Sequence, residues 1–173
     1  MAETIDVCDH TSVGVLIVDS EERVLLIERQ KYPFGMAGPA GHMDPEDGGD
    51  PERAALREVR EETGLIIAAG GLVKTTIQER RMSNNCRRNG QYHNWWVYTA
   101  TEYAGELSPK LDEAKNAGWY DRSDLQALAQ RTHAYEAGRV AEDDWVKNPG
   151  LEDVWLKFVL ELKFIDPWPD RRF

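Results

Sequence analysis

The chain has few cysteines, a shortage of positive charge and no long hydrophobic run. Its two cysteines, Cys8 and Cys86, lie far apart and outside any C-x-x-C pair. This scarcity argues against a disulfide-rich secreted scaffold and favours two free thiols in a reducing compartment. The apolar run from Val13 to Val18 is far too short to span a bilayer, and the start lacks the basic and apolar regions of a signal peptide. We therefore expect a cytoplasmic protein with no membrane partner.

The shortage of positive charge limits the class of partner. Lysine and arginine number 21, against 31 aspartates and glutamates among 173 residues, so the formal net charge is −10. Long nucleic acids need a basic surface that neutralises their phosphates, which argues against them as the main partner. A small phosphorylated ligand is compatible with this charge, because bound cations reverse the local field.

The most informative segment that is present is residues 57–65, REVREETGL. Glu58, Glu61 and Glu62 are three and four positions apart, so a helix gathers their side chains on one face. Like charges at this spacing destabilise a bare helix, and hard divalent cations that take carboxylate ligands would compensate them. Gly64 stands where a left-handed helix C-cap belongs. The segment therefore predicts a metal site for phosphate chemistry rather than a solvated acidic face.

Residues 41–65, GHMDPEDGGDPERAALREVREETGL, resemble the Nudix box, whose pattern is G-x5-E-x7-R-E-U-x-E-E-x-G-U with U a bulky aliphatic residue. The second half matches at every fixed position. The first half is two residues longer, and Gly48-Gly49 is the simplest place for the insertion. This placement puts Asp47 where the family has its loop glutamate, with Glu46 as the alternative.

Hydrophobic patterns and turn signals outline the rest of the chain. They predict strands over 11–18 and 23–28, a helix from Asp50-Pro51, strands over 65–68, 72–78 and 93–101, and a short strand from Trp119. A helix capped by Asp121 or Ser123 and running through 125–130 follows, and a C-terminal helix is expected at about 151–165. This order predicts an α/β fold with a mixed sheet between helical layers, and it is similar to the Nudix α/β/α sandwich. We expect a single domain over residues 1–173.

The resemblance implies a pyrophosphohydrolase with a divalent metal and assigns roles to particular residues. Glu58 and Glu62 are the expected direct metal ligands, Glu61 is a ligand or a water-orienting group, and the carbonyl of Ala40 is a further ligand. Glu58 and Glu61 also count as catalytic candidates. Mg²⁺ fits best, because it prefers oxygen ligands and shares its shell with phosphates; Mn²⁺ is the second choice. Arg57 is expected to orient the acids rather than to transfer protons.

The general base is expected to be either a helix glutamate or an acid from a later loop. Residues 110–114, KLDEA, precede Trp119 in the manner of the late Nudix loop that brings a further carboxylate to the metals. We select Glu113 as the base and Asp112 as the alternative, against the interpretation of both as solvated loop acids.

Four arginines between two predicted strands are candidate substrate contacts, since arginine is suited to clamping phosphate. They are Arg80, Arg81, Arg87 and Arg88. A solvated basic loop is the competing interpretation. His42 and His93 lie near the implied site, where packing or loop hydrogen bonding is the expected role of each.

These features predict a metal-dependent hydrolase that cleaves a pyrophosphate bond in a nucleoside diphosphate linked to another moiety. The expected partner is a small phosphorylated nucleotide-type substrate. The alternative is a non-catalytic nucleotide-sensing or protein-interaction module on the same fold, and the intact glutamate set favours the enzyme. An isomerase of isoprenoid diphosphates would need a cysteine near the start of the box, and residues 37–43 contain none. Substrate identity and oligomeric state, a homodimer included, stay open.

Overall fold

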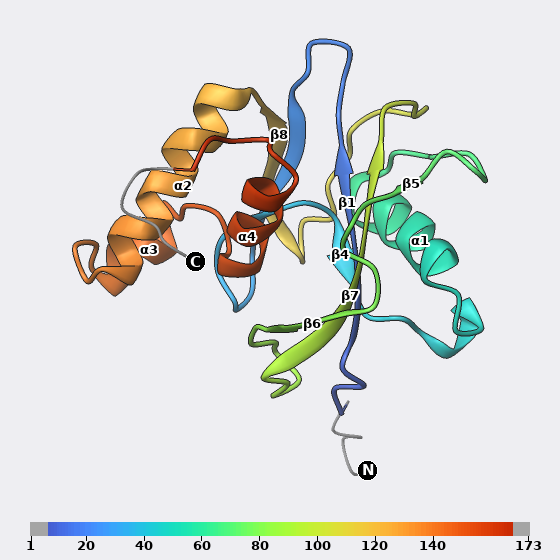
Figure 1. The fold of residues 1–173 in the computed structure, drawn as a ribbon, viewed down its shortest axis with the longest axis horizontal. Coiled ribbons are helices and arrows are strands. Elements are labelled where there is room, and N and C mark those ends of the chain that lie inside the picture. The colour runs from blue at the N-terminus through green and yellow to red at the C-terminus, as the bar shows by residue number, and fades with distance from the viewer. Residues whose placement is uncertain (1–6, 168–173) are drawn as a thin grey trace.

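The computed structural model describes residues 7–167, which form two β-sheets with helices on both sides (Figure 1). The strands are β1 (Thr11–Ile17), β2 (Val24–Arg29), β3 (Met36–Ala37), β4 (Ala40–Gly41), β5 (Val73–Lys74), β6 (Arg80–Ser83), β7 (Tyr92–Ala100) and β8 (Ala114–Tyr120). The helices are α1 (Pro51–Thr63), α2 (Arg122–Glu136), α3 (Glu142–Lys147) and α4 (Asp153–Glu161), with a 3-10 turn η1 (Pro45–Asp47). Within residues 7–167, no helix combines the length and apolarity needed to cross a bilayer.

The larger sheet is mixed and has the strand order β4-β1-β7-β5, with β6 also paired to β7. β1 and β7 run parallel along the whole of β1, from Thr11 beside Asn94 to Ile17 beside Ala100. The other pairs in this sheet are antiparallel. β7 therefore lies inside the sheet, as its bulky residues on both faces predict. The smaller sheet, β3-β2-β8, is antiparallel.

The chain passes between the two sheets three times, from β1 to β2, from β3 to β4 and from β7 to β8. β1 and β2 belong to different sheets and are joined only near their turn, where Val18 and Val24 form an isolated bridge. β3 and β4 are likewise divided, with Gly38-Pro39 between them. A Cβ added at Gly38 would lie 2.6 Å from both the Val15 carbonyl oxygen and the Trp155 ring, so this crossing requires glycine. The crossing between β3 and β4 places β4 in contact with α1.

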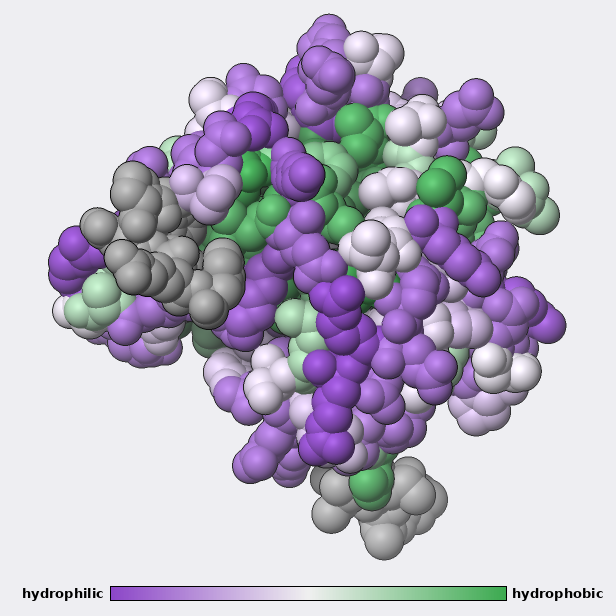
Figure 2. Space-filling view, in the orientation of Figure 1, coloured by the Kyte–Doolittle hydropathy of each residue, from purple (hydrophilic) through white to green (hydrophobic). Residues whose placement is uncertain are grey.

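Two apolar cores flank the larger sheet, because successive side chains of a strand point to opposite faces. Val15 of β1 packs in the core beneath α1, together with Val59 of that helix. Leu16 of β1 faces the other core, which α2 and α4 cover with residues such as Leu125 and Trp155. Figure 1 shows α1 on one side of the sheets and α2, α3 and α4 on the other, and Figure 2 shows hydrophilic residues over most of the surface seen in that view. The layering confirms the predicted α/β sandwich.

Several predicted elements differ in extent. Residues 65–68 form no strand, only a bridge between Ile66 and Ala104, and Trp119 lies near the end of β8 rather than at the start of a strand. Residues 72–78 contribute only the two-residue β5. Beyond Lys74 the backbone still bonds to β7, but both the Thr75 amide and the Ile77 carbonyl pair with the single residue Val97, so the regular ladder ends there. Thr75 Oγ1 and Gln78 Nε2 donate to the same Val97 carbonyl oxygen. α2 begins directly after Asp121, one of the two predicted caps, and extends beyond residue 130, and α3 was not predicted.

The C-terminal helix, expected at about 151–165, is shorter in the structure. α4 ends at Glu161, and Lys163 then adopts a left-handed conformation with φ of 62°. The backbone amide of Phe164 donates to the Val159 carbonyl oxygen across this reversal, which satisfies a carbonyl at the end of the helix. Ile165 is nevertheless buried. Its apolar side chain fits the helical pattern, but it reaches the core from the turn that follows the helix.

Candidate active site

The sequence signals at the two ends of α1 are confirmed, and they fix the orientation of its acidic face. Asp50 is the N-cap and its side chain accepts from the backbone amide of Glu52 at 2.9 Å, with Pro51 in the first helical turn. Gly64 closes the helix with φ of 75°. Because Val59 and its apolar neighbours are buried under the sheet, the acidic side of the helix turns toward β4 and the loop that follows it.

Two glutamates of α1 approach the backbone of β4. Glu62 Oε2 accepts a hydrogen bond from the Ala40 amide at 2.8 Å. A Cβ added at Gly41 would lie 2.1 Å from Glu58 Oε1, so a glycine is needed for this carboxylate to sit where it does. Desolvation by surrounding protein raises the pKa of Glu58 to about 7 and that of Glu62 to about 8. Nearby acids add to both shifts: Glu61 and Glu113 raise the pKa of Glu58, and Glu58 and Glu113 raise that of Glu62.

Arg57 is the arginine that holds the acids in place. Its Nε and Nη2 donate to the two carboxylate oxygens of Asp47 at 3.1 and 2.8 Å, and Nη1 donates to Glu58 Oε1 at 2.8 Å and to Glu61 Oε2 at 3.2 Å. The side chain of Asp47 is buried, and the bonded guanidinium lowers the pKa of this carboxyl. Glu46, the alternative loop acid, is 71% exposed, and its nearest contact with Arg57 is 3.9 Å. Asp47 is therefore the loop acid that binds Arg57 in this structure.

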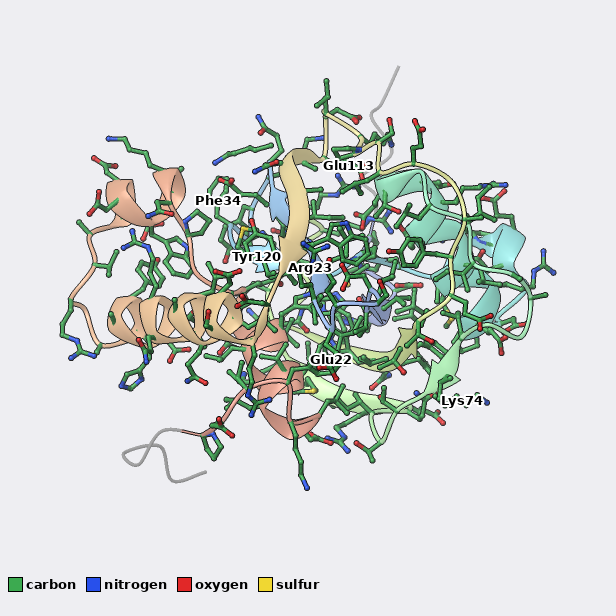
Figure 3. The ribbon with its side chains drawn as sticks, turned by 90° about the horizontal axis from the view of Figure 1, so that it is seen from above. Glu22, Arg23, Phe34, Lys74, Glu113 and Tyr120 are labelled. Atoms are coloured by element: carbon green, nitrogen blue, oxygen red, sulfur yellow. The ribbon has the colours of Figure 1, made fainter. Side chains whose placement is uncertain are left out.

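A cavity of about 250 Å³ opens beside these acids. Its walls include Glu58, Glu61 and Glu62 from α1 and Glu113 from the loop before β8. Figure 3 shows Glu113 between the start of β8 and α1. Lys110 Nζ contacts Glu113 Oε1 at 3.2 Å. Asp112 is more exposed and does not line the cavity. The fold thus brings the selected loop acid, rather than its neighbour, to the helix glutamates.

The four candidate substrate arginines separate into two pairs. Arg87 and Arg88, in the β6–β7 loop, line the cavity. Arg80 instead forms an ion pair with Glu161 at the end of α4, and the guanidinium of Arg81 lies 3.7 Å from the centre of the Tyr92 ring. The prediction is therefore corrected for Arg80 and Arg81, because strand pairing in β6 directs them to contacts outside the cavity.

Four charged residues of the cavity wall were not predicted from the sequence: Arg29, Lys31, Asp44 and Glu152. Arg29 ends β2, and its Nε lies 3.6 Å from Glu152 Oε2 just before α4; both residues line the cavity. Glu152 is buried, and desolvation raises the pKa of its carboxyl. The only signal for Arg29 was a charge that directly follows an apolar strand, and Glu152 carried none. His42 and His93, for which packing or loop hydrogen bonding was expected, line the same cavity.

The NUDIX domain family model matches residues 9–142. The chain belongs to the Nudix family. Among curated Nudix relatives, diphosphoinositol polyphosphate phosphohydrolase 3-alpha of Mus musculus is 30% identical over 112 residues, covering 65% of this chain and 63% of the relative. Nudix hydrolase 25 of Arabidopsis thaliana is 40% identical over 57 residues, covering 33% of this chain and 31% of that protein. The matches thus span less than two thirds of the length of these relatives.

Solved Nudix structures show the same fold. A MutT NUDIX hydrolase from Burkholderia pseudomallei is similar with a TM-score of 0.54 and 27% identity, over 66% of this chain and 84% of that one. A NUDIX-family hydrolase from Clostridium perfringens has a TM-score of 0.57 at 20% identity and covers 90% of this chain and 96% of its own. The second likeness, at low identity, concerns the fold alone.

Nudix hydrolases generally need a divalent metal, and the residues of this cavity fit one. Glu58, Glu61 and Glu62 supply oxygen donors from one helix face, which is the donor type that hard divalent cations take. Two of these acids are poorly solvated and hold their protons more tightly than usual, as expected where a cation would be the compensating charge. The guanidinium of Arg57 donates hydrogen bonds to Glu58 and Glu61, and it is also bonded to Asp47.

Proposed function

We propose that this Nudix protein hydrolyses a pyrophosphate bond in a small phosphorylated substrate, a nucleoside diphosphate linked to another moiety. The supporting observation is the cavity that has the three helix glutamates and Glu113 in its walls together with Arg87 and Arg88. Names of similar proteins refer to diphosphoinositol polyphosphate, to Ap4A and to bound ADP ribose. These compounds share linked phosphates, the chemistry that arginines and carboxylate-bound cations recognise.

The proposed metal is Mg²⁺, with Mn²⁺ as a functional replacement. Glu58 and Glu62 would be its direct ligands, with Glu61 and the carbonyl of Ala40 completing the set. When bound, the cation supplies positive charge to the phosphate oxygens and to the departing phosphate. Arg57 keeps Glu58 and Glu61 on the cavity side of the helix by hydrogen-bonding both while Asp47 anchors it. The cytoplasmic location expected from the sequence stays part of this proposal.

The remaining step is removal of a proton from the attacking water. We assign it to Glu113, because it faces the cavity from a separate loop and is not needed as a ligand of the cation. A positioned carboxylate in hydrogen-bonding reach of the water accelerates such a step by about 10²–10⁴-fold. Arg87 and Arg88 would hold the phosphate that is furthest from the helix acids.

A substrate panel with matched variants tests this function. ADP-ribose, dinucleoside polyphosphates, NADH, nucleotide sugars and nucleoside triphosphates are incubated with protein and Mg²⁺, and released phosphate or monophosphate is measured. We expect hydrolysis of at least one compound and its loss in excess EDTA. Glu62→Gln should remove most activity without unfolding the protein. Hydrolysis at wild-type rates in EDTA would refute the metal-dependent mechanism.

The same panel tests the base. Glu113→Gln should lower turnover by about 10²–10⁴-fold and leave KM nearly unchanged, while Asp112→Asn, its matched neighbour outside the cavity, should change turnover little. Near-normal turnover in Glu113→Gln would return the role of base to Glu58 or to Asp112. If a nucleotide binds and no compound is hydrolysed, the nucleotide-sensing alternative replaces the enzyme.

A further inference from the structure

Four side chains of metal-binding types from distant parts of the sequence meet beside the cavity, and three of them line it. They are Cys8 before β1, His42 after β4, Cys86 in the β6–β7 loop and His93 in β7. One donor atom from each lies within 4.8 Å of the others. Cys8 Sγ is 3.5 Å from His42 Nε2 and 3.3 Å from His93 Nε2. None of these side chains belongs to the carboxylate site on α1.

The spacing of the donor atoms suits a tetrahedral ion. Bond lengths of about 2.3 Å to sulfur and about 2.0 Å to nitrogen place neighbouring donors of a tetrahedral zinc site roughly 3.3–3.8 Å apart. The two sulfur-to-nitrogen distances at Cys8 fall in this range before any adjustment. Cys8 and His93 are buried, and His42 and Cys86 are half-buried. Four protein donors in a largely enclosed position are typical of structural zinc sites.

The ring of His93 is oriented as a metal ligand requires. Its Nδ1 lies 2.9 Å from Asn84 Oδ1, and Trp95 Nε1 donates to the same oxygen at 3.1 Å. Because the indole N–H can only donate, the atom it contacts is the amide oxygen, and His93 Nδ1 must carry a proton to donate to it. The lone pair of His93 then lies on Nε2, which faces Cys8. A hydrogen bond that fixes the opposite ring nitrogen is typical of zinc-bound histidine.

The β6–β7 loop closes tightly over both sulfur atoms. Cys86 and Gly90 are joined by a backbone hydrogen bond of 3.0 Å, and Asn89 between them has φ of 61°. A Cβ added at Gly90 would lie 2.4 Å from Cys8 Sγ and 3.0 Å from Cys86 Sγ. The loop thus depends on a glycine at the point where it covers the two thiols.

We propose that Cys8, His42, Cys86 and His93 bind one Zn²⁺ ion. Binding would release the proton of each cysteine thiol, so that two thiolates balance the charge of the ion while both histidines remain neutral. Soft sulfur donors with imidazole select zinc over Mg²⁺, which distinguishes this site from the carboxylate site. Neither cysteine is in a disulfide, so both sulfurs are available as ligands.

The ion would tie the arginine loop to the start of the Nudix box. Cys86 immediately precedes Arg87, and the carbonyl oxygen of His42 accepts from Arg57 Nη2 at 3.0 Å. Cys8 adds the segment that leads into β1, which lies beside the β6–β7 end of the larger sheet (Figure 1). The zinc site would therefore set the position of one wall of the cavity, and it requires no assumption about the substrate.

Metal content of the full chain tests the proposal. Protein without a histidine tag is loaded with Zn²⁺, freed of excess metal by gel filtration and analysed by mass spectrometry for zinc per chain. We expect one Zn²⁺ in the wild type and none in Cys86→Ser. Asn84→Ala keeps all four ligands but loses the orientation of His93, so zinc affinity should fall about 10- to 100-fold. His10→Asn is the matched control, since His10 Nδ1 is 3.8 Å from Cys8 Sγ but engages the Tyr92 carbonyl oxygen at 2.9 Å.

Cobalt gives a second measurement on the unmodified protein, which covers the case of a variant that does not fold. Co²⁺ titrated into metal-free wild type should produce thiolate-to-metal charge-transfer absorption and the intense visible bands of a tetrahedral ion, and Zn²⁺ should abolish them. If the cobalt bands are absent and the protein also retains no zinc, the site is overturned. Zinc that survives Cys86→Ser, or that is lost in His10→Asn, would overturn the ligand set. A Cys8–Cys86 disulfide in protein kept under reductant would replace the zinc site with a redox pair.

Discussion

Replacing Asp47 with alanine should destabilise the protein and slow catalysis, because this residue anchors the arginine that orients the helix acids. Asp47 is 3% exposed, so its carboxylate is shielded from solvent. The substitution removes two hydrogen bonds from Arg57 and one from the Asp44 amide at 2.7 Å. Arg57 would keep Glu58, Glu61 and the His42 carbonyl oxygen as partners, so its charge would still be partly compensated.

The expected magnitude follows from these contacts. Removing one partner of a buried ion pair costs about 3–5 kcal/mol, and a hydrogen bond to a charged group contributes about 1.5–3 kcal/mol. Because Arg57 retains other acceptors, we expect a loss near the lower end, about 2–4 kcal/mol in the free energy of unfolding. Turnover should fall about 10- to 100-fold, the range seen when a residue that orients metal ligands is lost.

Urea unfolding and kinetics on two variants measure this effect. Glu46→Ala is the matched control, since Glu46 is an adjacent acid that is 71% exposed and 3.9 Å from Arg57; a pair of this kind contributes about 0–1 kcal/mol. Arg57 lowers the pKa of Asp47, so the stabilisation is present above the unfolded pKa and is lost as pH falls through the folded value. The difference between wild type and Asp47→Ala should therefore shrink in acid. Equal destabilisation by both variants would refute the assignment of Asp47 as the anchor.

Two further predictions concern the helix glutamates Glu58 and Glu62. The folded pKa values of Glu58, about 7, and Glu62, about 8, lie above the unfolded value of 4.5, so the folded state retains protons that the unfolded state has released. Metal-free protein should therefore lose unfolding free energy between about pH 6.5 and about pH 8, and Mg²⁺ should restore it. Below this window the pKa of His93, lowered to about 4, makes stability rise with pH and so opposes the effect of the two glutamates. Denaturation in EDTA that shows stability rising between about pH 6.5 and about pH 8 would contradict the prediction. Gly41→Ala should displace Glu58, lowering activity while destabilising the fold by about 1–3 kcal/mol. Gly118→Ala, where the nearest atom to an added Cβ is at 3.7 Å, should change both properties little, and equal activity in the two variants would show that the close approach at Gly41 is dispensable.

Local sequence was sufficient to predict the acidic helix. The three-and-four spacing of Glu58, Glu61 and Glu62 defines one face through helical geometry alone. Asp50 and Gly64 mark its ends through caps that involve only neighbouring residues. The family resemblance in the same segment then indicated the fold and the chemistry, because residues close in sequence form both the helix and most of the box.

Tertiary structure decided which distant side chains meet. Arg80 and Arg87 belong to one basic segment, yet the pairing of β6 with β7 places Arg80 beside Glu161, 81 positions away, while the loop carries Arg87 to the cavity. Nothing in their spacing distinguishes them. The strand predicted over 72–78 is likewise limited to β5 by its partner strand, since Thr75 and Ile77 both pair with the single residue Val97.

The cysteine and histidine cluster also depends on tertiary structure rather than on local sequence. Cys8 and His93 are 85 positions apart, and neither Cys8 nor Cys86 lies in a recognisable metal-binding spacing. Their approach depends on the parallel register of β1 with β7 and on the turn that closes at Gly90. Sequence determined the helix because helical periodicity is local. Only the folded chain could bring the four donors together, since strand register and loop closure are set by contacts between segments that have no fixed separation in sequence.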